Sequence, residues 1–130
     1  MSDCLLLADC ERGKYDPDDV MRIFSQIPGI TNLERGEGGG RGSKVIDVDY
    51  TYGAETTHAE LLWTYGALSI EDLSNAGFML AVEFSKRYAS TYGGCLELFN
   101  EHYDFHQRLD EDTTLQSLRE MIEKEPFAAE

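Results

Sequence analysis

Two stretches in which apolar and polar residues alternate, 45–52 and 58–65, constrain the fold of this chain more than any other feature. A period of two residues is typical of a β-strand with one face buried. The five residues 53–57 between the stretches suit a hairpin loop. We therefore expect an antiparallel hairpin with one aliphatic and aromatic face. The side chains expected on that face are Ile46, Val48, Tyr50, Tyr52, Ala59, Leu61, Trp63 and Tyr65.

The opposite face of this hairpin is acidic. Asp47 and Asp49 lie on it in the first strand and Glu60 in the second, and Glu34 joins them if residues 30–35 pair as the next strand. Like charges side by side on a sheet cost stability, so their presence indicates a surface that meets a basic partner. An ordinary solvated acidic surface is the alternative. Acid–base catalysis by the paired carboxylates is disfavoured, because nothing apolar nearby would raise either pKa.

The charge balance supports the same interpretation. The chain carries 25 Asp and Glu against 11 Lys and Arg, a net charge of −14. Such a surface repels phosphate backbones and anionic membranes, so we expect neither nucleic-acid nor membrane binding. It attracts and steers a basic protein. Tyr52 and Tyr65, near the strand ends, are of the residue type that anchors protein interfaces.

Hydrophobic periodicity divides the rest of the chain into further strands and helices. Strands are expected at 4–8, 30–35 and 95–99, with a short one ending at Leu109. We expect the first of these to be buried on both faces and the strand 95–99 to be central in the sheet. Helices are expected from Asp16 to about Ile27, from Asp72 to about Thr91, and from Thr113 to about Pro126.

Capping signals mark where these helices begin. Asp16 is a good N-cap and Pro17 suits the first helical position. Ser69 with Asp72, and Thr113 with Gln116, have the spacing of capping boxes for the other two helices.

Together these elements predict an α+β fold. We expect a mostly antiparallel sheet of five to six strands with helices packed on one face, a ferredoxin-like β-α-β-β-α-β core with additions. At 130 residues the chain has the length of one domain. The expected domain spans residues 1–126, and residues 127–130 form a C-terminal tail.

One cluster has the composition of a metal site. His102, Asp104 and His106 share a face if they lie on a strand, and such ligands suit zinc or iron(II). His58 would have to join them as a fourth ligand. The alternative is an aromatic-rich strand whose exposed face is polar. The sequence contains no phosphate-binding glycine loop with the spacing of a P-loop, no nucleophile elbow and no His-Glu-x-x-His motif. We therefore expect no cofactor and no enzymatic activity.

The cysteines and the first residues bear on location. Cys4, Cys10 and Cys95 are odd in number and lack the Cys-x-x-Cys spacing, which favours thiols in a reducing compartment. The first ten residues lack the basic region and long apolar run of a signal peptide. We expect a cytoplasmic protein.

Four stretches carry a resemblance to a known group. Ile-Pro-Gly-Ile-Thr-Asn-Leu at 27–33, Val-Asp-Tyr-Thr-Tyr-Gly at 48–53, Leu-Ser-Ile at 68–70 and Leu-Phe-Asn-Glu-His-Tyr-Asp-Phe at 98–105 resemble small acidic bacterial proteins. Some of those are similar to the immunity proteins of polymorphic-toxin and contact-dependent inhibition systems.

The resemblance implies an antitoxin: an acidic inhibitor that occludes the active site of a cognate basic toxin. A small metal-dependent enzyme and a regulatory or scaffold subunit are the alternatives. The chain is expected to be a monomer or a homodimer.

Overall fold

Seven strands and three helices are formed by the residues that the computed structural model describes, which are 4–9, 11–36, 44–62, 66–71, 74–94, 96–100 and 106–124. The strands are β1 (Leu5–Asp9), β2 (Ile30–Arg35), β3 (Lys44–Tyr52), β4 (Glu55–Leu62), β5 (Leu68–Ile70), β6 (Leu96–Asn100) and β7 (His106–Leu109). The helices are α1 (Pro17–Phe24), α2 (Asn75–Tyr92) and α3 (Leu115–Lys124). The expected tail, residues 127–130, lies outside the described residues.

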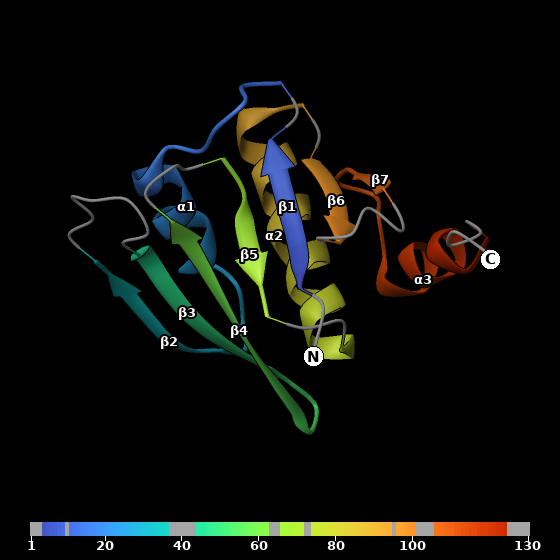
Figure 1. The fold of residues 1–130 in the computed structure, drawn as a ribbon, viewed down its shortest axis with the longest axis horizontal. Helices are drawn as coiled ribbons and strands as arrows, with labels where there is room; N and C mark the ends of the chain where they lie inside the picture. The colour runs from blue at the N-terminus through green and yellow to red at the C-terminus, as the bar shows by residue number, and fades with distance from the viewer. Residues whose placement is uncertain are drawn as a thin grey trace.

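All seven strands belong to one sheet in the order β2-β3-β4-β5-β1-β6-β7, and every neighbouring pair is antiparallel. β5 and β6 are joined through α2 and lie on either side of β1, a split β-α-β arrangement. Helices α1 and α2 pack behind the sheet, and α3 lies beyond β7 (Figure 1). The predicted α+β class is confirmed, with seven strands where the sequence predicted five or six.

The predicted hairpin is formed by β3 and β4, but its loop is shorter than expected. Tyr52 pairs with Glu55, so the turn contains only Gly53 and Ala54. Gly53 has a φ of 63°, the left-handed conformation that tight hairpin turns require. The expected five-residue loop was wrong because residues 55–57 pair with residues 50–52 of β3. The side chain of Glu55 reaches α2, where its Oε1 accepts the N–H of Ala76 at 3.0 Å.

The first helix begins as predicted. Asp16 accepts a hydrogen bond from the N–H of Asp18, and Pro17 is the first helical residue. Helix α2 does not begin at the expected box, because Ser69 lies within β5. Ser74 is its N-cap and accepts from the N–H of Gly77.

The capping box predicted at Thr113 and Gln116 for α3 is shifted by one residue, to Thr114 and Ser117. The Thr114 hydroxyl accepts from the N–H of Ser117, and the Ser117 hydroxyl accepts in return from the N–H of Thr114. The hydroxyl of Thr113 instead accepts from the N–H of Asp110 in the preceding turn.

Strand β1 is buried on one face only. Leu5 and Leu7 have no exposed surface, whereas Leu6 and Ala8 are half-buried, because the helices cover a single face of the sheet. The prediction of a strand buried on both faces was therefore wrong. Strand β6 was expected to be central, but it lies next to the edge strand β7.

An aromatic cluster fills the space between the sheet and the helices. Tyr15 makes edge-to-face contacts with Phe84 and Tyr88, with ring centroids 5.9 and 5.5 Å apart, and Phe24 packs on Phe84 at 5.0 Å. The Tyr15 hydroxyl donates to the carbonyl of Leu7 at 2.8 Å, so its polar atom is satisfied inside the core. No helix among the described residues is long and apolar enough to cross a membrane.

Candidate functional site

Four carboxylates predicted to meet a partner lie on three adjacent strands of the sheet. Glu34 of β2 pairs with Asp47 of β3, which pairs on its other side with Glu60 of β4. Asp49 lies two residues along β3 on the same face. We call Glu34, Asp47, Asp49 and Glu60 the acidic patch. The described helices pack on the opposite face (Figure 1), so these helices leave the patch uncovered.

His58 lies among three residues of the acidic patch: Asp47, Asp49 and Glu60. His58 of β4 pairs with Asp49 across the hairpin. Its Nδ1 lies 2.8 Å from Asp49 Oδ1, its Nε2 lies 2.6 Å from Asp47 Oδ1, and Glu60 Oε2 is 3.9 Å away. The ring therefore bridges two carboxylates of the neighbouring strand. This arrangement offsets the repulsion that alternating acids on one sheet face would otherwise create.

The environment of His58 changes its pKa. Partial burial lowers this pKa, but the hydrogen bond to Asp49 and the charges of Asp47, Asp49 and Glu60 outweigh the burial, so the pKa lies above its ordinary value. The ring carries a positive charge over a wider pH range than a free histidine. The patch therefore contains one group that can carry a positive charge among its four acidic side chains.

Replacing His58 tests whether its charge, held by Asp47 and Asp49, stabilises the fold. A raised folded-state pKa means that the stabilisation is fully present below about pH 6.5 and is lost as the pH rises through the raised value. We expect His58→Gln to lower the free energy of unfolding by about 1 kcal/mol near pH 6 and by less near about pH 9. Urea unfolding at both pH values measures the difference.

His106→Gln is the matched control for this measurement. Its ring is 54% exposed and lies 3.3 Å from a carboxylate oxygen of Glu97. Because exposed ion pairs contribute little to stability, we expect almost no change in stability at either pH. An equal cost of His58→Gln at the two pH values would contradict the coupling.

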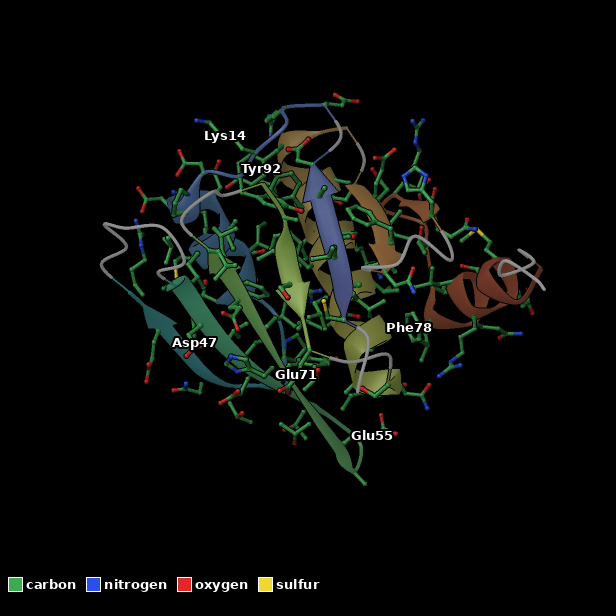
Figure 2. All side chains as sticks on the ribbon, viewed as in Figure 1. Lys14, Asp47, Glu55, Glu71, Phe78 and Tyr92 are labelled. Atoms are coloured by element: carbon green, nitrogen blue, oxygen red, sulfur yellow. The ribbon has the colours of Figure 1, made fainter. Side chains whose placement is uncertain are left out.

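Sequence reasoning missed two contributions to this surface. Glu71 follows β5, and its N–H donates to the carbonyl of His58 at 2.8 Å, which brings an exposed fifth acid beside the patch (Figure 2). The bridging role of His58 was also not predicted, although the strand register that creates it follows from the two-residue turn. Among the described residues, no Lys or Arg forms an ion pair with Glu34, Asp49 or Glu60.

Of the two predicted aromatic anchors, Tyr52 does not join the acidic patch. Tyr52 is 40% exposed and lies at the tip of the hairpin, on the face that carries Val48 and Tyr50. It is therefore on the opposite side of β3 from Asp47 and Asp49. Tyr65 lies outside the described residues, so its predicted role stays a prediction.

The candidate metal cluster is described only in part. His102 and Asp104 lie outside the described residues. His106 of β7 faces Phe99 of β6, with ring centroids 6.1 Å apart, and its Nε2 is near Glu97. Among the described residues, no group of three or more His, Cys, Asp or Glu side chains could hold a metal ion.

Comparison with protein-family models, with curated proteins and with solved structures finds no match for this chain. The function must therefore be argued from the residues themselves.

Proposed function

We propose that this protein is an acidic immunity protein, an inhibitor that neutralises a cognate bacterial toxin by steric and electrostatic occlusion. The observation that carries the proposal is the acidic patch: four carboxylates on adjacent strands of one sheet face, three of which lie around His58. Inhibition of this kind needs no catalytic group. It needs only a surface that fits over a basic site and stays there.

The charge distribution supports a basic partner. Four other acidic residues of the described chain already pair with arginine: Asp9, Asp18, Asp19 and Glu83. Glu34, Asp49 and Glu60 have no such cation of their own among the described residues. A basic protein surface would supply the missing cations. The net charge of −14 would speed the encounter by long-range steering.

The rigidity of the patch also supports binding. Asp47 and Glu60 lie in the two long strands of the hairpin. The hydrogen bond with His58 restricts the carboxylate of Asp49, and the ion-pair contact with His58 Nε2 restricts that of Asp47. A preordered acidic surface loses less conformational entropy on association than flexible side chains on a loop. The partner is therefore expected to dock without rearrangement of the sheet.

A capture experiment tests the proposal. The tagged protein serves as bait in a lysate of its native cells, at low and at high salt. We expect a basic protein that is retained at low salt and released at high salt. Expression of the captured protein should arrest growth, and co-expression of the inhibitor should restore it.

Two variants with the same change in net charge make the capture specific. Asp47→Asn with Asp49→Asn neutralises the patch, whereas Glu111→Gln with Asp112→Asn neutralises an exposed turn before α3. We expect the first variant to lose most of the captured protein and the second to retain it. Equal capture by both variants would overturn the assignment of the patch, and a captured protein without toxicity would overturn the immunity function.

A further inference from the structure

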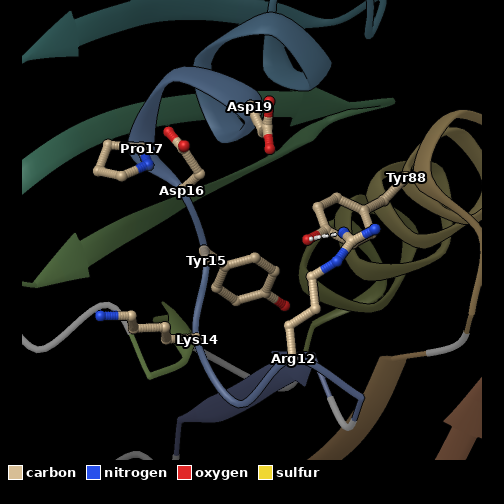
Figure 3. Close-up of a pocket in the computed structure, with 7 residues that line it drawn as sticks. All are labelled: Arg12, Lys14, Tyr15, Asp16, Pro17, Asp19 and Tyr88. Carbon is tan, nitrogen blue, oxygen red and sulfur yellow. Dashed lines mark hydrogen bonds between the residues drawn. The ribbon is translucent and has the colours of Figure 1, made fainter.

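A pocket of about 500 Å³ lies between the loop after β1, the beginning of α1 and the C-terminal half of α2 (Figure 3). Its lining consists of Arg12, Lys14, Tyr15, Asp16, Pro17, Asp19 and Tyr88. The volume is in the range of small-molecule sites in proteins. No residue of the acidic patch lines it, so its function does not depend on the partner proposed above.

The guanidinium of Arg12 is held in place at this pocket. It lies over two rings of α2, 5.8 Å from the centroid of Tyr88 and 5.5 Å from that of Tyr92. Nη1 donates to the Tyr88 hydroxyl at 3.0 Å and Nη2 to the Tyr92 carbonyl at 2.9 Å. The side chain nevertheless remains 46% exposed. Since a guanidinium has five N–H groups, the described bonds leave donors available for a ligand.

The buried carboxylate of Asp9 fixes the position of Tyr88 and of the backbone at Arg12. Asp9 is 4% exposed; its Oδ2 accepts from the Tyr88 hydroxyl at 2.7 Å, and its Oδ1 accepts from the N–H groups of Glu11 and Arg12. Burial and the bond to Asp9 raise the pKa of Tyr88, so this hydroxyl stays protonated and keeps donating. Arg12 is thereby fixed through both its backbone and its side chain. A cation restrained in this way is preorganised for a planar anion such as a carboxylate.

The other charged residues of the lining indicate which charges the ligand has. Lys14 is exposed and forms no ion pair with a described residue. Asp16 uses Oδ1 to cap α1 and keeps its second oxygen for a ligand. Asp19 accepts from Arg22 at 3.1 Å through Oδ1 and also bonds the Tyr92 hydroxyl, so it contributes its negative charge to the lining. The lining therefore combines two cations with two carboxylates. A polyphosphate would meet the repulsion of both carboxylates, whereas a ligand with one charge of each sign matches the lining.

We propose that this pocket binds a small zwitterion of the α-amino-acid class. Arg12 receives its carboxylate, and the second oxygen of Asp16 receives its ammonium group. Lys14 and Asp19 add one charge of each sign to the lining. This is a small-molecule site in addition to the protein-binding surface.

Nuclear magnetic resonance titration of the ¹⁵N-labelled protein tests the proposal. Each standard L-amino acid is added at millimolar concentration, and for any that binds, its N-acetyl and carboxamide derivatives follow. We expect at least one amino acid to shift the backbone amides of residues 12–19, and each derivative to bind about tenfold more weakly because it lacks one charge. The absence of shifts with every amino acid, or equal binding of either derivative, would overturn the proposal.

Two mild variants separate binding from folding. Lys14→Gln removes a cation that has no described ion pair, and Asp16→Ser removes the carboxylate while keeping a good N-cap. Each is expected to weaken binding about tenfold with an unchanged spectrum of the free protein. Lys86→Gln, an exposed cation on the far side of α2, is the control. Unchanged affinity in both pocket variants would show that the ligand binds elsewhere.

Discussion

Asp9→Ala is expected to lower the free energy of unfolding by about 3 kcal/mol, a large effect for a single polar substitution. The carboxylate of Asp9 is buried and accepts three hydrogen bonds, from the Tyr88 hydroxyl and from the N–H groups of Glu11 and Arg12. Alanine leaves all three donors without their acceptor, and the Tyr88 hydroxyl is itself buried. Arg12 retains access to water, which keeps the cost below that of a fully buried ion pair.

Denaturant unfolding of Asp9→Ala, Tyr88→Phe and the double variant measures this network. We expect Tyr88→Phe to cost about 1 kcal/mol. The double variant should cost less than the sum of the two, because the bond between the two residues is lost only once. A loss of less than about 1 kcal/mol in the free energy of unfolding of Asp9→Ala would contradict this account. It would mean that water molecules accept the hydrogen bonds of the turn as well as the Asp9 carboxylate does.

Features that depend on neighbouring residues in the chain were predictable. The alternation in 45–52 and 58–65 fixes which side chains share a face, so the acids of β3 and β4 were expected together and lie together. Asp16 followed by Pro17 marks the beginning of α1 for the same reason: the N-cap bond joins residues two apart. Such signals need no knowledge of the tertiary structure.

Features that depend on distant residues were not predictable. The beginning of α2 is capped in part by Glu55 of the hairpin, 21 residues away from Ala76, and a search for a local capping box cannot find it. The pocket depends on the bond between Arg12 and Tyr88, which are 76 residues apart. The position of Arg12 on those rings follows from how the loop after β1 meets α2. The hydrophobic periodicity of the sequence does not predict this contact.

The contact of His58 with Asp47 and Asp49 was only partly predictable. Its position opposite Asp49 depends on the register of the hairpin, which a two-residue turn and a five-residue loop set differently. Once the turn is known to contain Gly53 and Ala54 only, the pairing follows. A sequence that ends a strand with tyrosine and continues Gly-Ala-Glu gives too weak a turn signal to decide this in advance.

The rate of association with the proposed basic partner is the second large effect expected. Neutralising Asp47 and Asp49 together should slow association about tenfold at low salt, with a smaller change in the dissociation rate. The reason is that charged groups act mainly through the long-range field that orients an approaching partner, so their loss changes the association rate most. The dependence of the association rate on ionic strength should also flatten.

Stopped-flow mixing with the captured toxin over a range of salt concentrations measures both quantities. The variant Glu111→Gln with Asp112→Asn has the same net charge, so it reports the effect of total charge alone, and we expect it to change the rate less than about twofold. If the two double variants slow association equally, steering arises from the net charge of −14 and the patch has no orienting role. If only the patch variant slows it, the arrangement of the carboxylates on β2, β3 and β4 selects the partner's orientation. The sheet face around His58 would then be the surface that meets the toxin first.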